Sequence, residues 1–206
     1  LKLAVSVFSF ESVFHYLRCW VADFETEEID RLENYVLGLG IRGKRKWSQI
    51  FTRKLNSNLI ISDVTDEDEA QRQIHFMEGI NRTRERLMEQ IAPLLEANAV
   101  PPGGTASRKG KTAGEMVRIL YDFIVKGRIQ EKLSGFAAYF RENGNPERAR
   151  EYDQIYRLVM ELLEQIMGLL KDEPMSLSDF AEILDAGFSE IEVGIIPGSV
   201  DRVVVG

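Results

Sequence analysis

Apolar residues recur at three- and four-residue intervals along most of this 206-residue chain, and this periodicity restricts its fold more than any other feature. Such spacing places apolar side chains on one face of an α-helix, whereas strands would show strict alternation. The longest run covers residues 66–97, where a charged residue, Arg84, interrupts one apolar stripe. The stripe consists of Met77, Ile80, Leu87, Ile91 and Leu94. The sequence therefore predicts a mainly α, multi-helix domain with one long helix over 66–97.

Helix-start signals divide the remainder of the chain. Ser9 precedes an amphipathic stretch as a candidate N-cap, because its hydroxyl can accept a hydrogen bond from a free backbone N–H. Thr112 with Glu115, and Ser176 with Asp179, have the three-residue spacing of a capping box. Further helices are expected from Thr26 to the glycines Gly38 and Gly40, over 130–140, and from Pro146 to about Lys171. The helix that follows Thr112 is expected to bury Val117, Leu120, Tyr121 and Ile124.

The pattern changes after Gly187. The stretch "IEVGIIPGSVDRVVVG" is rich in β-branched residues and glycine, which predicts one or two short strands at the C-terminal end. We therefore divide the chain into a helical domain at 1–190 and a β segment at 191–206. A stretch rich in Pro, Gly, Ser and Ala at about 98–111 is expected to be a flexible linker between helices. The chain begins with Leu1 and stops within an apparent strand, so we expect it to be a piece of a longer protein.

Composition excludes several classes of protein. A hydrophobic content of 44% and a charged content of 29% are ordinary for a soluble globular domain. No apolar run approaches the eighteen or so residues of a membrane span, so no membrane partner is expected. Cys19 is the only cysteine, which excludes an internal disulfide and fits a reducing cytoplasm. The net charge of −7 argues against a globally basic nucleic-acid binder, although it permits a local basic patch.

The stretch "GGTASRKGKT" at 103–112 superficially resembles a phosphate-binding loop. That motif requires four residues between its first glycine and the Gly-Lys pair. Counting back from Gly110 places Thr105 where this glycine should be, and Gly104 is one residue too distant. A helix end and two prolines precede the stretch, where a nucleotide-binding loop would follow a buried strand. We therefore expect no nucleotide site here. The same spacing argues against an independent nucleotide-binding enzyme.

No other stretch has the arrangement of a catalytic or metal site. His15 and His75 are isolated from cysteines and carboxylates at useful spacing, and no Ser-His-Asp or Cys-His set stands out. We therefore assign no catalytic residue, metal ligand or cofactor to this chain.

The most unusual segment is "GIRGKRKWSQIFTRK". Between residues 42 and 62 there are six basic residues and no acidic one. The preceding "LGLGIRG" resembles the turn of helix–hairpin–helix modules, in which backbone N–H groups meet a DNA phosphate. Basic side chains would bind phosphates, and an aromatic ring could stack on an exposed base. The alternative is a solvated basic loop whose tryptophan packs on the domain. The candidate DNA-binding residues are Arg42, Lys44, Arg45, Lys46, Trp47, Arg53 and Lys54.

Several segments, in order and over nearly the whole chain, resemble the B subunit of the AddAB (RexAB-type) helicase–nuclease. The most specific are "IDRLENYVLGLGIRG" and "GIIPGSVDRVVVG"; others are "FSFESVFHYLRCW", "TAGEMVRILYDFI" and "AREYDQIYRLVMELLEQI". The linker "ANAVPPGGTASRKGKT" is longer and less typical than the resemblance leads us to expect.

The resemblance implies a helical 2B-like insertion in the second half of a superfamily-1-like helicase fold, followed by the strand that returns to its 2A core. It implies a bacterial, cytoplasmic complex that resects double-strand breaks for recombinational repair, with a B subunit that participates in recognising the Chi sequence. The family's ATP and Mg site lies N-terminal to this region, and its nuclease motif and iron–sulfur cluster lie C-terminal. The implied partners are double-stranded or forked DNA and the companion A subunit. The alternative function is a non-catalytic module that docks on that subunit.

Overall fold

The computed structural model describes residues 1–6, 8–53, 66–97 and 111–190, and every regular element within these ranges is a helix. This confirms the prediction of a mainly α fold. The predicted β segment at 191–206 and almost all of the predicted linker, 98–110, lie outside the described residues. The elements are α1 (Lys2–Val5), α2 (Phe10–Leu17), a 3₁₀ turn (Trp20–Ala22), α3 (Thr26–Leu39), α4 (Lys44–Trp47), α5 (Asp66–Ala97), α6 (Ala113–Lys126), α7 (Ile129–Glu142), α8 (Pro146–Leu170) and α9 (Leu177–Glu190).

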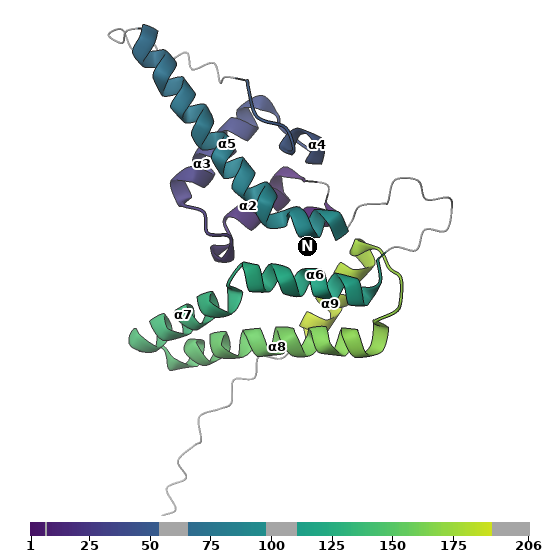
Figure 1. Ribbon diagram of the computed structural model, residues 1–206. Helices are drawn as coiled ribbons and strands as arrows, with labels where there is room; N and C mark the ends of the chain where they lie inside the picture. The colour runs from purple at the N-terminus through teal and green to yellow at the C-terminus, as the bar shows by residue number, and fades with distance from the viewer. Residues whose placement is uncertain (7, 54–65, 98–110, 191–206) are drawn as a thin grey trace, which may run out of the picture.

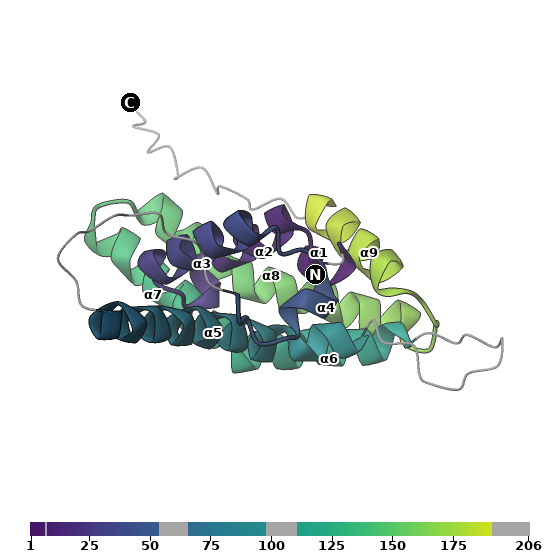
Figure 2. The same cartoon turned by 90° about the horizontal axis from the view of Figure 1, so that it is seen from above.

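The helices form two layers (Figure 1). The N-terminal layer contains α2, α3 and α4 beside the long helix α5. The second layer contains α6 to α9, in which α7 packs along α8 and α6 packs on both α8 and α5. The short helix α1 contacts α5 and α9, and so joins the layers at a second place (Figure 2).

The predicted helix starts are confirmed by their hydrogen bonds. The Ser9 hydroxyl accepts from the Ser12 N–H at 3.2 Å. The Thr112 hydroxyl accepts from the Glu115 N–H at 3.3 Å, and the Glu115 carboxylate accepts from the Thr112 N–H at 2.8 Å. Ser176 and Asp179 exchange the same pair of bonds at the start of α9. Each cap satisfies backbone donors that the first turn of a helix leaves free.

One continuous apolar core joins both layers, and the long helix α5 supplies much of it. Its stripe is confirmed: Ile80, Leu87, Ile91 and Leu94 are buried, with Met77 packed against them. The core also draws buried residues from α2, α3, α6, α8 and α9.

Two local expectations are wrong. Gly38 does not end α3, which continues to Leu39 and ends at Gly40. Tyr121 is predicted to lie on the buried face of α6, but it is 47% exposed because it faces a groove between α6 and α8.

Candidate functional site

Two glycines direct the chain into residues 42–53, which we call the basic segment. Gly40 ends α3 with a φ of 59°, and Gly43 begins α4 with a φ of 82°. Residues that carry a side chain rarely adopt these positive φ values, so glycine is the residue suited to both positions. The Gly43 N–H donates to the Phe8 carbonyl at 3.4 Å, which ties the turn to the N-terminal region of the chain. The sequence signal "LGLGIRG" therefore corresponds to a real turn, followed by the single-turn helix α4.

Five of the six predicted basic residues are described, and all five are exposed. They are Arg42, Lys44, Arg45, Lys46 and Arg53; Lys54 lies outside the described residues. Within the described part of the chain, none of the five forms an ion pair with a carboxylate. The Lys46 ammonium donates to the Gly40 carbonyl at 3.3 Å. We call these five residues the basic surface.

The structure corrects the role predicted for Trp47. Its side chain is only 1% exposed, so it cannot stack on a nucleic-acid base. Its ring instead contacts Phe8, Phe14 and Phe51 at centroid distances of 6.2, 6.5 and 5.7 Å. Packing on the domain, the alternative considered for this residue, is what the structure shows. Trp47 therefore anchors α4 to the core, and the basic side chains beside it are exposed on a helix that is held in place.

Side chains of α3 and α5 hold the backbone of the basic segment in place. Arg84, which is 7% exposed, donates to the Trp47 carbonyl at 3.1 Å, and its guanidinium lies 5.7 Å from the Phe51 ring centre. The Asn81 amide accepts from the Phe51 N–H at 2.8 Å and donates to the Phe51 carbonyl at 2.9 Å.

Tyr35 completes this set of contacts by donating to the Arg53 carbonyl at 2.7 Å. Burial raises the pKa of the Tyr35 hydroxyl, and the nearby Arg53 charge partly offsets that effect, so the hydroxyl stays a neutral donor. Sequence reasoning missed Tyr35, Asn81 and Arg84. The one available signal was the interruption of the α5 stripe at Arg84, because a charged residue on a buried face needs a hydrogen-bonding partner.

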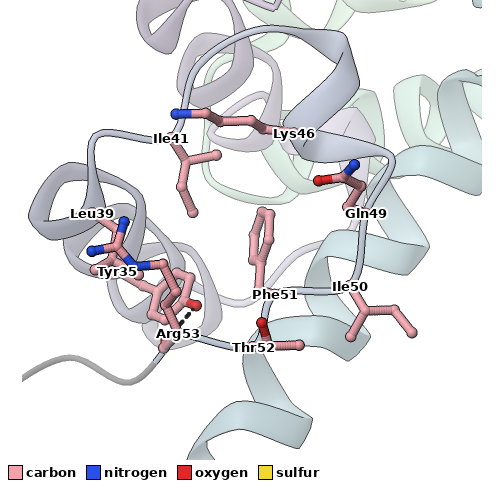
Figure 3. Close-up of a pocket in the computed structure, with 9 residues that line it drawn as sticks. All are labelled: Tyr35, Leu39, Ile41, Lys46, Gln49, Ile50, Phe51, Thr52 and Arg53. Carbon is pink, nitrogen blue, oxygen red and sulfur yellow. Dashed lines mark hydrogen bonds between the residues drawn. The ribbon is translucent and has the colours of Figure 1, made fainter.

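A pocket of about 200 Å³ opens beside the basic surface. Figure 3 shows Lys46 and Arg53 at different parts of its wall, with the Phe51 ring to one side of both. Tyr35, Leu39 and Ile41 supply further apolar lining. Gln49, Ile50 and Thr52 complete the lining.

A second and larger concavity lies between α6 and α8. It measures about 560 Å³ and combines apolar residues such as Tyr121 and Met160 with charges of both signs, including Arg118, Asp122 and Glu164. Its mixed charge distinguishes it from the basic surface.

The remaining chemistry of the described residues is sparse. Among them, no three His, Cys, Asp or Glu side chains gather closely enough to hold a metal ion. No helix in the described part of the chain is long and apolar enough to cross a membrane. The residues brought together at the basic surface can bind an anion and present apolar contacts to it.

No protein-family model matches the chain. Comparison with curated proteins finds many similar proteins named as the B subunit of an ATP-dependent helicase/deoxyribonuclease. The one from Lachnoclostridium phytofermentans is 35% identical over 202 residues, which cover 97% of this chain and 16% of the relative. Those from Acetivibrio thermocellus and Clostridium acetobutylicum are 35% and 32% identical, each over 100% of this chain and 17% of the relative. The resemblance seen in the sequence is confirmed, and the chain spans about one sixth of the length of these relatives.

Proposed function

Because this chain matches one segment of the B subunits of ATP-dependent helicase/deoxyribonucleases over nearly its whole length, we propose that it is an accessory domain that positions DNA for such an enzyme. The observation that carries the proposal is the basic surface. Five exposed cations have no carboxylate partner among the described residues, although the chain as a whole has a net charge of −7. Other cations of the described residues, such as Arg18 and Arg86, are paired with carboxylates. The basic surface is therefore a local concentration of positive charge available to an anionic ligand.

Duplex DNA is the ligand that best uses such a surface. Its phosphates repeat at short intervals, so several adjacent cations can each neutralise one of them. Such contacts fix the position of the duplex but carry no sequence information. The backbone of Lys46 and Arg53 is held by hydrogen bonds, which suits this role. Binding DNA then costs little conformational entropy, because the backbone that carries these cations is already ordered.

The setting of this domain is part of the proposal. We place it as a 2B-like insertion in a bacterial, cytoplasmic enzyme that acts in the repair of double-strand breaks by recombination. ATP, Mg and an iron–sulfur cluster would be held by other parts of that enzyme. The companion A subunit would be its protein partner.

A second candidate function is supported by the groove between α6 and α8. Its apolar lining, exposed Tyr121 and charges of both signs have the composition of a protein-binding surface. We propose docking on the companion subunit as the alternative role of this domain. The basic surface would then meet acidic protein in place of DNA.

The salt dependence of DNA binding tests the first role. Substitution of Arg42, Lys44, Arg45 and Lys46 by alanine, in the full-length subunit assembled with its companion, removes up to four phosphate contacts. The slope of log affinity against log salt should flatten by roughly three to four units, since each contact contributes about 0.9. The loss should be equal for forked duplexes of different sequence, because phosphate contacts do not read bases.

The control removes as much charge without touching the basic surface. Arg72, Arg82, Lys126 and Arg150 are exposed, form no ion pair with a described residue, and are spread over α5, α6 and α8. Their replacement by alanine should leave the slope close to that of the wild type. If the basic-surface variant keeps wild-type affinity and slope on forked duplex, the first role is wrong and docking on the companion subunit takes its place.

A further inference from the structure

The pocket beside the basic surface has the dimensions of a single small group. Its volume of about 200 Å³ lies below the roughly 300–1,000 Å³ of pockets that enclose drug-sized ligands. One planar ring fits such a space, whereas a larger molecule would remain mostly outside it. Leu39, Ile41 and Phe51 provide apolar contact for that ring.

The charges of the pocket define the chemistry attached to this ring. Lys46 and Arg53 both line it, and neither is paired with a carboxylate of the described residues. Figure 3 shows the two side chains reaching the pocket from different positions along the chain, so a group held there can meet both cations. The occupant therefore combines an apolar planar part with negative charge at two positions. A nucleotide within a strand has this pattern, because a phosphate precedes its base and another follows it.

The pocket is formed before any ligand binds. Asn81 holds both backbone groups of Phe51, and Tyr35 holds the carbonyl of Arg53. Tyr35 also stacks on Phe51 with a centroid distance of 5.4 Å and an interplanar angle of 26°, which fixes the Phe51 ring in the pocket wall. A site fixed in this way loses little entropy on binding.

We propose that this pocket accepts one unpaired nucleotide of a DNA strand, with its base against the apolar lining and its flanking phosphates on Lys46 and Arg53. This inference rests on the proposed DNA-positioning function and specifies it. A base already free of a partner enters at the lowest cost, because no base pair has to be opened. The domain therefore prefers a duplex that ends in an unpaired strand to a blunt duplex. Contact with one base corresponds to an affinity about tenfold higher for the duplex with an unpaired strand than for the blunt duplex.

The test fills the pocket and leaves all five cations in place. Thr52 is exposed and lines the pocket, so Thr52→Met adds apolar bulk there at little risk to folding. Ser48→Met is the matched control, because Ser48 is an exposed residue of the same segment that does not line the pocket. Both variants are made in the full-length subunit, assembled with its companion and assayed without ATP. The probe is a forked duplex with 2-aminopurine as its first unpaired nucleotide, and a blunt duplex is measured in parallel.

The expected result is that Thr52→Met loses the roughly tenfold preference for the forked duplex and the 2-aminopurine fluorescence change, while its affinity for the blunt duplex and its salt slope stay at wild-type values. Ser48→Met should keep both the preference and the fluorescence change. The inference is overturned if Thr52→Met behaves as Ser48→Met does. It is also overturned if Thr52→Met weakens assembly with the companion subunit and leaves the DNA preference intact, since the pocket would then hold a protein side chain. Failure of the proposed DNA-positioning function is seen in a different measurement. It would appear as an unchanged salt slope on blunt duplex when Arg42, Lys44, Arg45 and Lys46 are replaced by alanine.

Discussion

Replacement of Asn81, a half-buried residue of α5, by alanine should destabilise the basic segment. The Asn81 amide is the partner of both the Phe51 N–H and the Phe51 carbonyl, at 2.8 and 2.9 Å, and it also accepts from the Arg84 guanidinium at 3.3 Å. Phe51 is 6% exposed, so water replaces these partners poorly. Each backbone group left without a partner costs about 1–3 kcal/mol, and two such groups give about 2–4 kcal/mol when water reaches one of them in part.

Thermal and denaturant unfolding of the 206-residue chain measure this loss. For a chain of this size the melting temperature should fall by roughly 4–16 °C. Hydrogen exchange gives the local readout, because the Phe51 N–H should exchange much faster in the variant. Asn143→Ala is the matched control: Asn143 also donates to a backbone carbonyl, that of Tyr139 at 2.8 Å, but it is exposed at the end of α7. A loss below about 0.5 kcal/mol for Asn81→Ala, with unchanged exchange at Phe51, would refute the view that Asn81 holds this segment.

Three further predictions concern the scaffold. Trp47→Ala should lower the free energy of unfolding by about 3–5 kcal/mol, measured by denaturant unfolding, because it leaves a cavity among three aromatic rings. Weaker DNA binding by this variant with an unchanged free energy of unfolding would contradict a structural role for Trp47. Gly187→Ala should cost about 1–3 kcal/mol, since its new methyl group would lie 2.4 Å from a Leu162 methyl carbon, whereas Gly135→Ala meets open space and should be neutral or stabilising in the same assay. Hydrogen bonds from Ser176 lower the pKa of Asp179, so the stabilisation they provide is present above the unfolded-state pKa and is lost as pH falls through the folded-state pKa. Ser176→Ala should therefore show a weaker dependence of melting temperature on pH in the acidic range than the wild type, and an identical dependence would contradict this cap.

The helical fold was predictable because its signals are local. The caps at Ser9, Thr112 and Ser176 depend on residues three positions apart, and the stripe of α5 depends on its own period. The basic surface was predictable for a similar reason, since its residues fall close together in the sequence with no acidic residue among them.

The position of Trp47 was not predictable in this way. Its burial depends on Phe8 and Phe14, which are distant in sequence, and on Arg84 in another helix. Tyr121 illustrates the same limit, because its period places it on the apolar face of α6 while the packing of α8 leaves a groove there. Periodicity identifies the face that a helix can bury, but tertiary packing decides how much of that face is covered.

The bonds that secure the basic segment all end on main-chain atoms. Arg84 reaches the carbonyl of Trp47, Asn81 reaches both backbone groups of Phe51, and Tyr35 reaches the carbonyl of Arg53. None of these bonds depends on which side chain stands at the solvent-facing positions between them. The segment can therefore accumulate substitutions at 42, 44–46, 49, 50, 52 and 53 while its path is conserved, and homologous domains can diverge in the ligand they prefer without diverging in shape. A library randomised at these positions should yield mostly folded proteins that differ in what they bind.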